Sequence, residues 1–126
     1  MVDYSNQLFN YLAENYKGNI IVQNIQIPSS FPTVTIDETS NIDVDLDSDS
    51  AKYARVEYRV QVFTTGDSKR TDARDIFSQI DTLLQKYLRK ISYTTTPEIY
   101  NSDVYCIEVT YRGVVDSNGT FYKGDE

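Results

Sequence analysis

Two long runs of this sequence alternate apolar and polar residues, and that period of two restricts the folds open to the chain. The runs span residues 55–65 and 104–115. Successive side chains of a β-strand point to opposite faces, so each run predicts a strand with one buried face. The apolar positions are Val56, Tyr58, Val60 and Val62 in the first run, and Tyr105, Ile107, Val109 and Tyr111 in the second.

The segment between the two runs has a helical period and supplies a cover for that face. Apolar residues recur about every 3.6 positions across residues 69–89, which predicts an amphipathic helix. Ser68 is the expected N-cap, and Asp72 and Asp75 lie near the positive end of the helix dipole. The apolar stripe consists of Ala73, Ile76, Phe77, Ile80, Leu83, Leu84, Tyr87 and Leu88.

Shorter patterns predict the N-terminal elements. Residues 3–17 have apolar side chains at helical spacing, and Gly18 then favours the end of a helix. Residues 20–27 and 31–37 are rich in β-branched side chains and predict two strands.

The remaining elements are predicted from turn and loop signals. Residues 92–101 are rich in Thr, contain Pro97 and predict a loop. Asn118 and Gly119 lie between two β-rich runs and predict a hairpin, because both residue types tolerate positive φ. The chain is then expected to return as a strand over residues 120–123.

The order of these elements is helix, several strands, helix and hairpin. This order predicts an α+β fold with an antiparallel or mixed β-sheet, two main helices packed on one face and a final β-hairpin. A chain of 126 residues fits one domain, and the sequence contains no repeat or linker. We therefore expect a single domain over residues 1–126.

The composition excludes several kinds of chemical site. The sequence contains no His and one Cys, Cys106, so it has no Ser-His-Asp triad, His-ligated zinc or disulfide. Cys106 lies in the middle of a predicted strand, where a small buried hydrophobe is expected. The glycines form no phosphate-binding motif. We accordingly predict no catalytic residue, no metal site, no cofactor and no enzymatic activity.

Residues 37–49 are unusual because they contain six carboxylates and no basic residue. Within them, residues 42–47 alternate apolar and acidic side chains, as in a strand with a carboxylate face. A calcium loop that starts at Asp43 requires Gly at its sixth position and Glu at its twelfth, where the chain has Ser48 and Ala54. A solvated strand face is the simpler interpretation. The carboxylates are Asp37, Glu38, Asp43, Asp45, Asp47 and Asp49.

The charge balance argues against a nucleic-acid-binding protein. The formal net charge is −7, and an acidic chain binds phosphate backbones poorly. Lys69, Arg70 and Arg74 form a local basic cluster, which a solvated helix face explains. The N-terminus has no secretory signal pattern, and no apolar run approaches the length of a membrane span.

The C-terminal half of the sequence resembles a known family. The similarity lies in the strand over residues 56–64, the helix that follows it, the strand over residues 104–116 and the aromatic return over residues 118–123. Together these segments resemble the tail terminator and head–tail connector (tail completion) proteins of long-tailed bacteriophages. The resemblance covers residues 55–123, and its motifs are structural patterns. The acidic stretch departs from the family pattern.

The resemblance implies a structural virion protein of the tail or neck, present in the host cytoplasm during assembly. Such proteins form homo-oligomeric rings, commonly hexameric, that bind the last ring of tail tube protein and stop tube growth. They present a second surface to the neck or head-completion protein. DNA passes through such a ring without specific binding, and neither a membrane nor a cofactor is implied.

The acidic stretch leads to a hypothesis within this resemblance. Asp43, Asp45, Asp47 and Asp49 line the lumen of the ring, where like charge keeps DNA from adhering. The competing hypothesis is a loop at the rim that becomes ordered on binding the tail tube.

Two alternative functions stay open at this stage. One is a head-completion or stopper protein of the neck with a similar fold. The other, from a different class, is a small enzyme whose acidic residues meet in space.

Overall fold

The computed structural model describes residues 5–18, 20–21, 28, 30–46, 51–96, 103–116 and 118–123. The helices are α1 (Ser5–Asn15) and α2 (Lys69–Leu84). The strands are β1 (Ile20–Ile21), β2 (Thr33–Leu46), β3 (Ala51–Thr65), β4 (Arg89–Thr96), β5 (Val104–Asp116) and β6 (Phe121–Tyr122). The predicted α+β class is confirmed.

The strands form one mixed sheet in the order β1-β2-β3-β5-β4, with β6 paired to β5. β1 runs parallel to β2, and the other neighbouring strands are antiparallel. β3 and β5 lie at the centre, where Tyr58 is opposite Tyr111 and Val60 is opposite Val109. The two alternating runs of sequence therefore place their apolar positions on the same face of the sheet.

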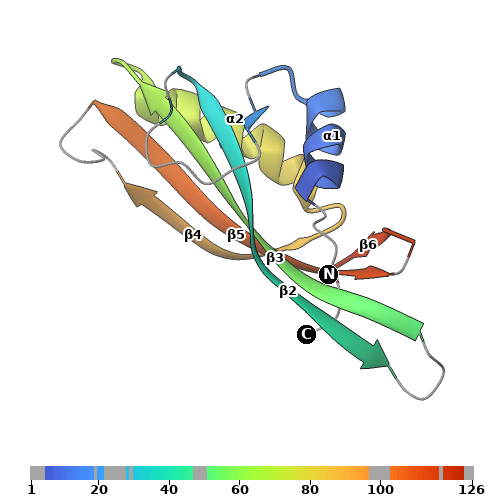
Figure 1. The fold of residues 1–126 in the computed structure, drawn as a ribbon. Helices are drawn as coiled ribbons and strands as arrows, with labels where there is room; N and C mark the ends of the chain where they lie inside the picture. Colours follow the sequence, from blue (N-terminus) through green and yellow to red (C-terminus); the bar gives the residue numbers. More distant parts are fainter. Residues whose placement is uncertain are drawn as a thin grey trace.

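Both helices cover that face, as Figure 1 shows. α2 contacts β3 and β5, whereas α1 contacts β1, β2 and α2. The core between helices and sheet includes Leu12, Ile36, Ile80 and Leu84, whose side chains are at most 1% exposed. Full burial of an aliphatic side chain of this size contributes about 1.5–3 kcal/mol. The predicted packing of two helices on one face is confirmed.

The second helix is shorter than the sequence predicts. α2 ends at Leu84, and the N–H groups of Tyr87 and Leu88 both donate to the Leu84 carbonyl oxygen in the turn that follows. Leu88 is fully buried, so it fits the apolar stripe by spacing but packs into the core from the turn. Apolar spacing alone does not mark this helix end.

β4 corrects the prediction of a helix to residue 89 and a loop over residues 92–101. Its eight residues, Arg89–Thr96, form an edge strand in which every side chain is exposed. An exposed edge strand has no alternation of buried and solvated positions, so the period-two signal is missing. Its Thr and Tyr content nevertheless suits a pleated strand. The end of the predicted loop, residues 97–101, lies outside the described residues.

The N-terminal elements agree with the predictions in kind. α1 lies within the predicted helix over residues 3–17, and β1 begins the predicted strand over residues 20–27, of which 22–27 lie outside the described residues. β2 joins the 31–37 run and the alternating acidic run into one strand. Its register shifts between Glu38 and Ser40, where a bulge interrupts the ladder.

The predicted Asn-Gly hairpin is confirmed. Gly119 has a φ of +84°, a conformation that glycine adopts without steric cost. The N–H groups of Thr120 and Asn118 donate to the Asp116 carboxylate at 3.0 and 2.9 Å, and these bonds lower the pKa of Asp116. Ser68 occupies the predicted N-cap position of α2, but its side chain makes no capping hydrogen bond.

Candidate functional site

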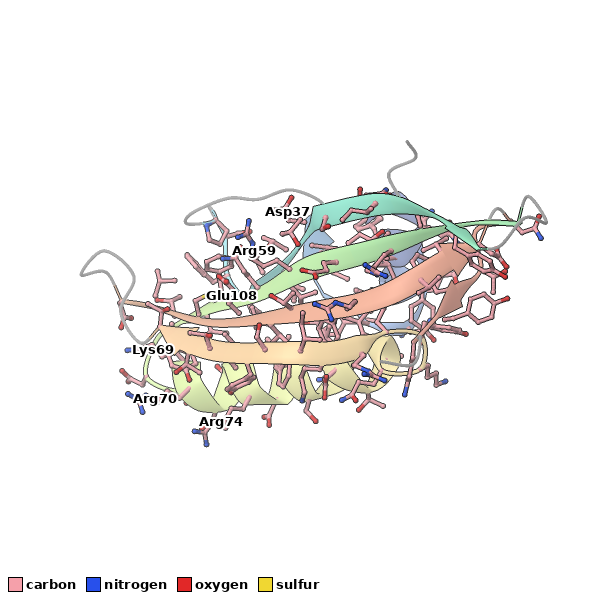
Figure 2. All side chains as sticks on the ribbon, turned by 90° about the horizontal axis from the view of Figure 1, so that it is seen from below. Asp37, Arg59, Lys69, Arg70, Arg74 and Glu108 are labelled. Carbon is pink, nitrogen blue, oxygen red and sulfur yellow. The ribbon has the colours of Figure 1, made fainter. Side chains whose placement is uncertain are left out.

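The sheet face opposite the helices, here called the outer face, carries cross-strand ion pairs. Arg59 on β3 contacts Asp37 on β2 at 2.8 Å, and Arg112 on β5 contacts Glu57 on β3 at 3.1 Å. The four side chains are 27–48% exposed, so each pair contributes little to stability, about 0–1 kcal/mol. Asp37 and Arg59 are visible on this face in Figure 2.

Neutral hydrogen bonds extend the same pattern across three strands. The Thr35 hydroxyl donates to Gln61 Oε1 at 3.1 Å, and Gln61 Nε2 donates to Glu108 at 3.2 Å. Cross-strand polar pairs of this kind satisfy the hydrogen-bonding groups of both side chains. The outer face is therefore built for contact with water or with another polar surface.

Cys106 lies on the outer face within a small apolar cluster formed with Phe63, Val104 and Phe31. The thiol is 3% exposed, and burial together with the charge of Glu108 raises its pKa to about 12. A thiol with such a pKa is not a nucleophile at neutral pH. The predicted structural role of Cys106 as a small buried hydrophobe is confirmed.

β4 forms one edge of the sheet and exposes large side chains. Tyr93 is 46% exposed and Ile91 is 39% exposed. The Tyr93 ring lies edge-on to Phe77 of α2 with ring centroids 5.3 Å apart, so β4 is anchored to the helix on its inner side. In the described part of the chain, no strand pairs with the outer edge of β4. An edge of this kind presents backbone N–H and C=O groups for pairing.

The start of α2 carries the basic residues that the sequence singles out, and the structure divides them. Lys69 contacts Asp103 at 2.7 Å, whereas Arg70 lies over the Tyr105 ring with its guanidinium 5.8 Å from the centroid. Arg74 is exposed one turn further on. Figure 2 shows all three basic side chains on the side of the molecule where β4 forms the edge.

Asp103 was not found by sequence reasoning. Lys69 Nζ, the N–H of Gly66 and the hydroxyl of Thr65 all donate to its carboxylate and lower its pKa. The residue thus fastens the β3–α2 turn to the start of β5. No local sequence pattern predicts the role of Asp103, because its partners lie more than thirty positions earlier in the chain.

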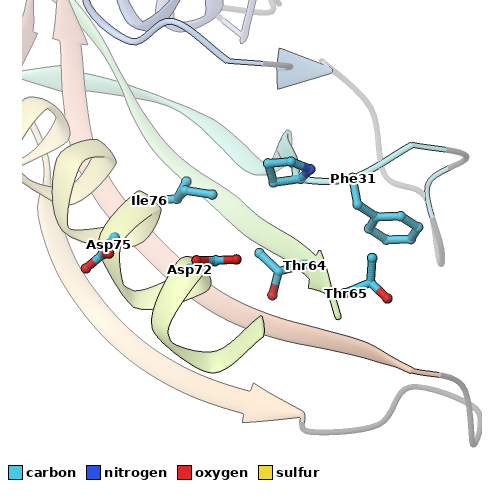
Figure 3. Close-up of a pocket in the computed structure, with 7 residues that line it drawn as sticks. Phe31, Thr64, Thr65, Asp72, Asp75 and Ile76 are labelled. Carbon is cyan, nitrogen blue, oxygen red and sulfur yellow. The ribbon is translucent and has the colours of Figure 1, made fainter. Parts of the chain in front are cut away.

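A pocket of about 240 Å³ lies on the flank of α2 opposite Arg70 and Arg74. It is bounded by the helix, the end of β3 and the start of β2 (Figure 3). Its wall is apolar at Phe31, Pro32 and Ile76, and Asp72 and Asp75 line it on the side of α2. In Figure 3 the Asp72 carboxylate points toward Thr64. We call this cavity the acidic pocket. It is lined by Phe31, Pro32, Thr64, Thr65, Asp72, Asp75 and Ile76.

A second pocket, of about 230 Å³, lies between α1, the turn after α2 and the final hairpin. Tyr11 packs edge-on against Tyr87 at a centroid distance of 5.3 Å and donates a hydrogen bond to the Leu83 carbonyl at 2.9 Å. Gln7 donates to the Gly119 carbonyl. These contacts join α1 to the turn after α2 and to the C-terminal hairpin. We therefore assign the residues around this pocket a structural role.

The acidic strip of the lumen hypothesis is only in part within the described residues. Asp43 and Asp45 belong to β2, where their backbones pair with Ala54 and Lys52, but their side chains lie outside the described part. Asp47 and Asp49 also lie outside it. Among the described side chains, no group of three or more His, Cys, Asp or Glu residues lies close enough to hold a metal ion. Neither described helix is long and apolar enough to cross a membrane.

Comparison with known proteins identifies similarity at the level of the fold. No family model and no curated protein matches the sequence. Among solved structures, the chain is similar to one from the "Virion of native gene transfer agent (GTA) particle", with a TM-score of 0.61 and 12% sequence identity. The match covers 90% of this chain and 92% of that chain. The α+β fold described above is thus similar, over most of its length, to that of a chain of this particle.

Proposed function

We propose that this chain is a structural virion protein, and specifically a tail terminator. In this role, copies of the chain form a ring that caps the tail tube of a phage-like particle and joins the tube to the neck. The observation that carries the proposal is the fold similarity to a chain of a gene transfer agent virion, which extends over nine-tenths of both chains.

The sequence resemblance adds support for the terminator role. The residues that carry it, 55–123, form the continuous series β3, α2, β4, β5 and β6 in the structure. The resemblance implies a strand that enters a helix, a variable loop, a further strand and an aromatic return. In the structure, β4 lies between that helix and the further strand. These elements also make up the centre of the sheet and one edge of it.

The surfaces of the molecule suit repeated protein contacts. A ring member needs two different surfaces, one for each neighbour, and further surfaces for the tube and the neck. The exposed edge of β4, with Tyr93, and the polar outer face are candidates for such contacts.

We further propose that Asp43, Asp45, Asp47 and Asp49 face the lumen of the ring. A hexamer would repeat these carboxylates six times around the channel, and phosphate backbones are repelled by such a wall. A structure of the assembled ring tests the proposal. Carboxylates on the outer wall of the ring would overturn it.

Deletion of the gene from its particle-producing host tests the terminator function. The proposal predicts tails of uncontrolled length, because nothing stops tube growth. Tails of normal length that fail to join heads would identify a stopper protein of the neck instead. Complete particles with normal tails would contradict both roles.

A further inference from the structure

We propose that neighbouring copies of this chain contact each other head to tail through α2. In this contact Arg70 and Arg74 of one copy, here called the basic flank, bind the acidic pocket of the next copy. The inference rests on the proposed function as a ring and names the surfaces that the ring uses.

The first observation is that α2 carries opposite charges on its two flanks. Its buried stripe contains Ala73, Ile76 and Ile80, which face the sheet. At about 100° per residue, Arg70 and Arg74 fall on one side of that stripe, and Asp72 and Asp75 fall on the other. The contacts agree, since Arg70 lies over Tyr105 of β5, whereas both carboxylates line the pocket with Phe31 and Pro32.

The second observation is that the two flanks face opposite edges of the sheet. The basic flank lies toward β4, and the acidic pocket lies toward β2, which is separated from β4 by β3 and β5. Figures 2 and 3 show the two sides. Complementary surfaces on opposite sides of α2 cannot meet within one chain. They meet when a second copy is placed alongside in the same orientation, which is the heterologous contact from which closed rings are built.

The third observation is that the pocket has the chemistry of an arginine site. Phe31, Pro32 and Ile76 offer an apolar wall for the aliphatic part of the side chain. Asp72 and Asp75 offer carboxylates to the guanidinium, which binds carboxylates through two parallel hydrogen bonds. Among the described residues, neither carboxylate forms an ion pair.

The basic flank is equally available for such a contact. Arg74 is exposed and forms no ion pair among the described residues. Arg70 is held against the Tyr105 ring, which restricts its side chain before binding. Lys69 is committed to Asp103, so it is not included in the contact.

A charge exchange tests the contact. The first variant carries Arg70→Glu and Arg74→Glu, and the second carries Asp72→Lys and Asp75→Lys. Each variant alone has two flanks of like charge, so we expect its subunit dissociation constant to rise about tenfold or more. An equimolar mixture should assemble again, because the exchanged flanks of the two variants complement each other. Native mass spectrometry should then show alternating oligomers.

A matched variant controls for net charge. Lys86→Glu with Lys123→Glu changes two exposed basic residues away from the start of α2 and alters the net charge as the first variant does. It should assemble as the wild-type chain does. Circular dichroism and thermal unfolding of every variant establish that the monomers are folded.

The possible outcomes separate this inference from the proposed function. A wild-type oligomer that survives both exchanges would overturn the α2 contact and leave the ring intact. Folded variants that fail to assemble when mixed would also overturn the contact. A wild-type chain that stays monomeric at every concentration tested would overturn the α2 contact as a surface that assembles the chain by itself. Tail length in the deletion strain reports the capping function independently.

Discussion

Two tyrosines of the central strands bury their rings and still satisfy their hydroxyl groups. Tyr58 donates to Glu38 at 2.8 Å, and Tyr111 donates to Asp81 at 2.6 Å. Both tyrosines are 0% exposed. Each phenol therefore packs like an apolar core residue at one end and ties the core to a carboxylate at the other. At the scale of single residues, the core of this protein is stabilised by apolar packing and by a few charged acceptors.

Removal of the Tyr111 hydroxyl should destabilise the fold. The Asp81 carboxylate is only 16% exposed, and Tyr111→Phe takes away one of its donors. We expect the free energy of unfolding to fall by about 1–2 kcal/mol in a urea titration. Tyr93→Phe is the control, because Tyr93 is 46% exposed, and it should change stability by less than about 0.5 kcal/mol. Equal effects of the two changes would contradict the role of the buried hydrogen bond.

The same tyrosine predicts a loss of stability at alkaline pH. Burial, and then the hydrogen bond and charge of Asp81, raise the pKa of Tyr111 above its ordinary value of 10.0. The folded state therefore keeps the phenol protonated where the unfolded chain ionises. Stability is fully present below about pH 10 and is lost as the pH rises above that value. Unfolding measured from pH 8 to 11 should show a steeper decline for the wild type than for Tyr111→Phe.

Cys106 provides a probe of the outer apolar cluster. Because the thiol is buried and its pKa is raised to about 12, a maleimide reagent should label the folded protein slowly at pH 7. Labelling in denaturant should be complete within minutes. Rapid labelling of the native chain would show that the cluster around Cys106 opens readily.

At the scale of helices and strands, the stripe of α2 is the main contact between helix and sheet. Ile80→Asp places a carboxylate at a position that is 0% exposed, and we expect a loss of about 4 kcal/mol or more. Gln79→Asp puts the same side chain on the adjacent exposed position and should cost less than about 1 kcal/mol. Thermal unfolding of both variants checks the prediction. A stable, folded Ile80→Asp chain would show that the stripe is not the core.

The elements with strong periodicity could be predicted from the sequence, and those without it could not. β3 and β5 alternate because one face is buried, and the hairpin before β6 has a glycine at the required positive φ. β4 is exposed along its whole length and is defined by pairing with β5, which is a long-range property. Leu88 satisfies the helical spacing from a turn, so apolar spacing predicts a helix that extends past the observed end of α2.

The candidate surfaces, too, could be predicted only where the signal is local in the sequence. The basic residues of α2 are apparent as a cluster in the sequence. The ion pair that Lys69 forms with Asp103 depends on the fold and is not apparent there. The acidic pocket combines Asp72 and Asp75 with Phe31, which is about forty residues away in the chain. Sequence spacing predicts that both carboxylates lie near the start of the helix. It does not predict the apolar wall of the pocket, because Phe31 is distant in the sequence. The pocket is therefore a result of packing between α2 and the start of β2.

At the scale of the whole molecule, the proposed function makes this chain a repeating part of a larger assembly. One face of the sheet is covered by helices, the outer face carries cross-strand polar pairs, and α2 has basic residues on its flank toward β4 and aspartates on its flank toward β2. A molecule with two different, complementary surfaces can bind one neighbour through each of them. A ring forms when the last copy in the series binds the first. In the proposed tail terminator, the tube and the neck contact the two rims of that ring.

Electron cryomicroscopy of the assembled particle can show whether this chain caps the tail tube. We expect copies of this chain in a closed ring at the end of the tail tube that faces the neck, with a channel through the centre. A purified particle that lacks the chain, or that holds it elsewhere, such as in the capsid shell or at the tail tip, would overturn the proposed tail terminator role.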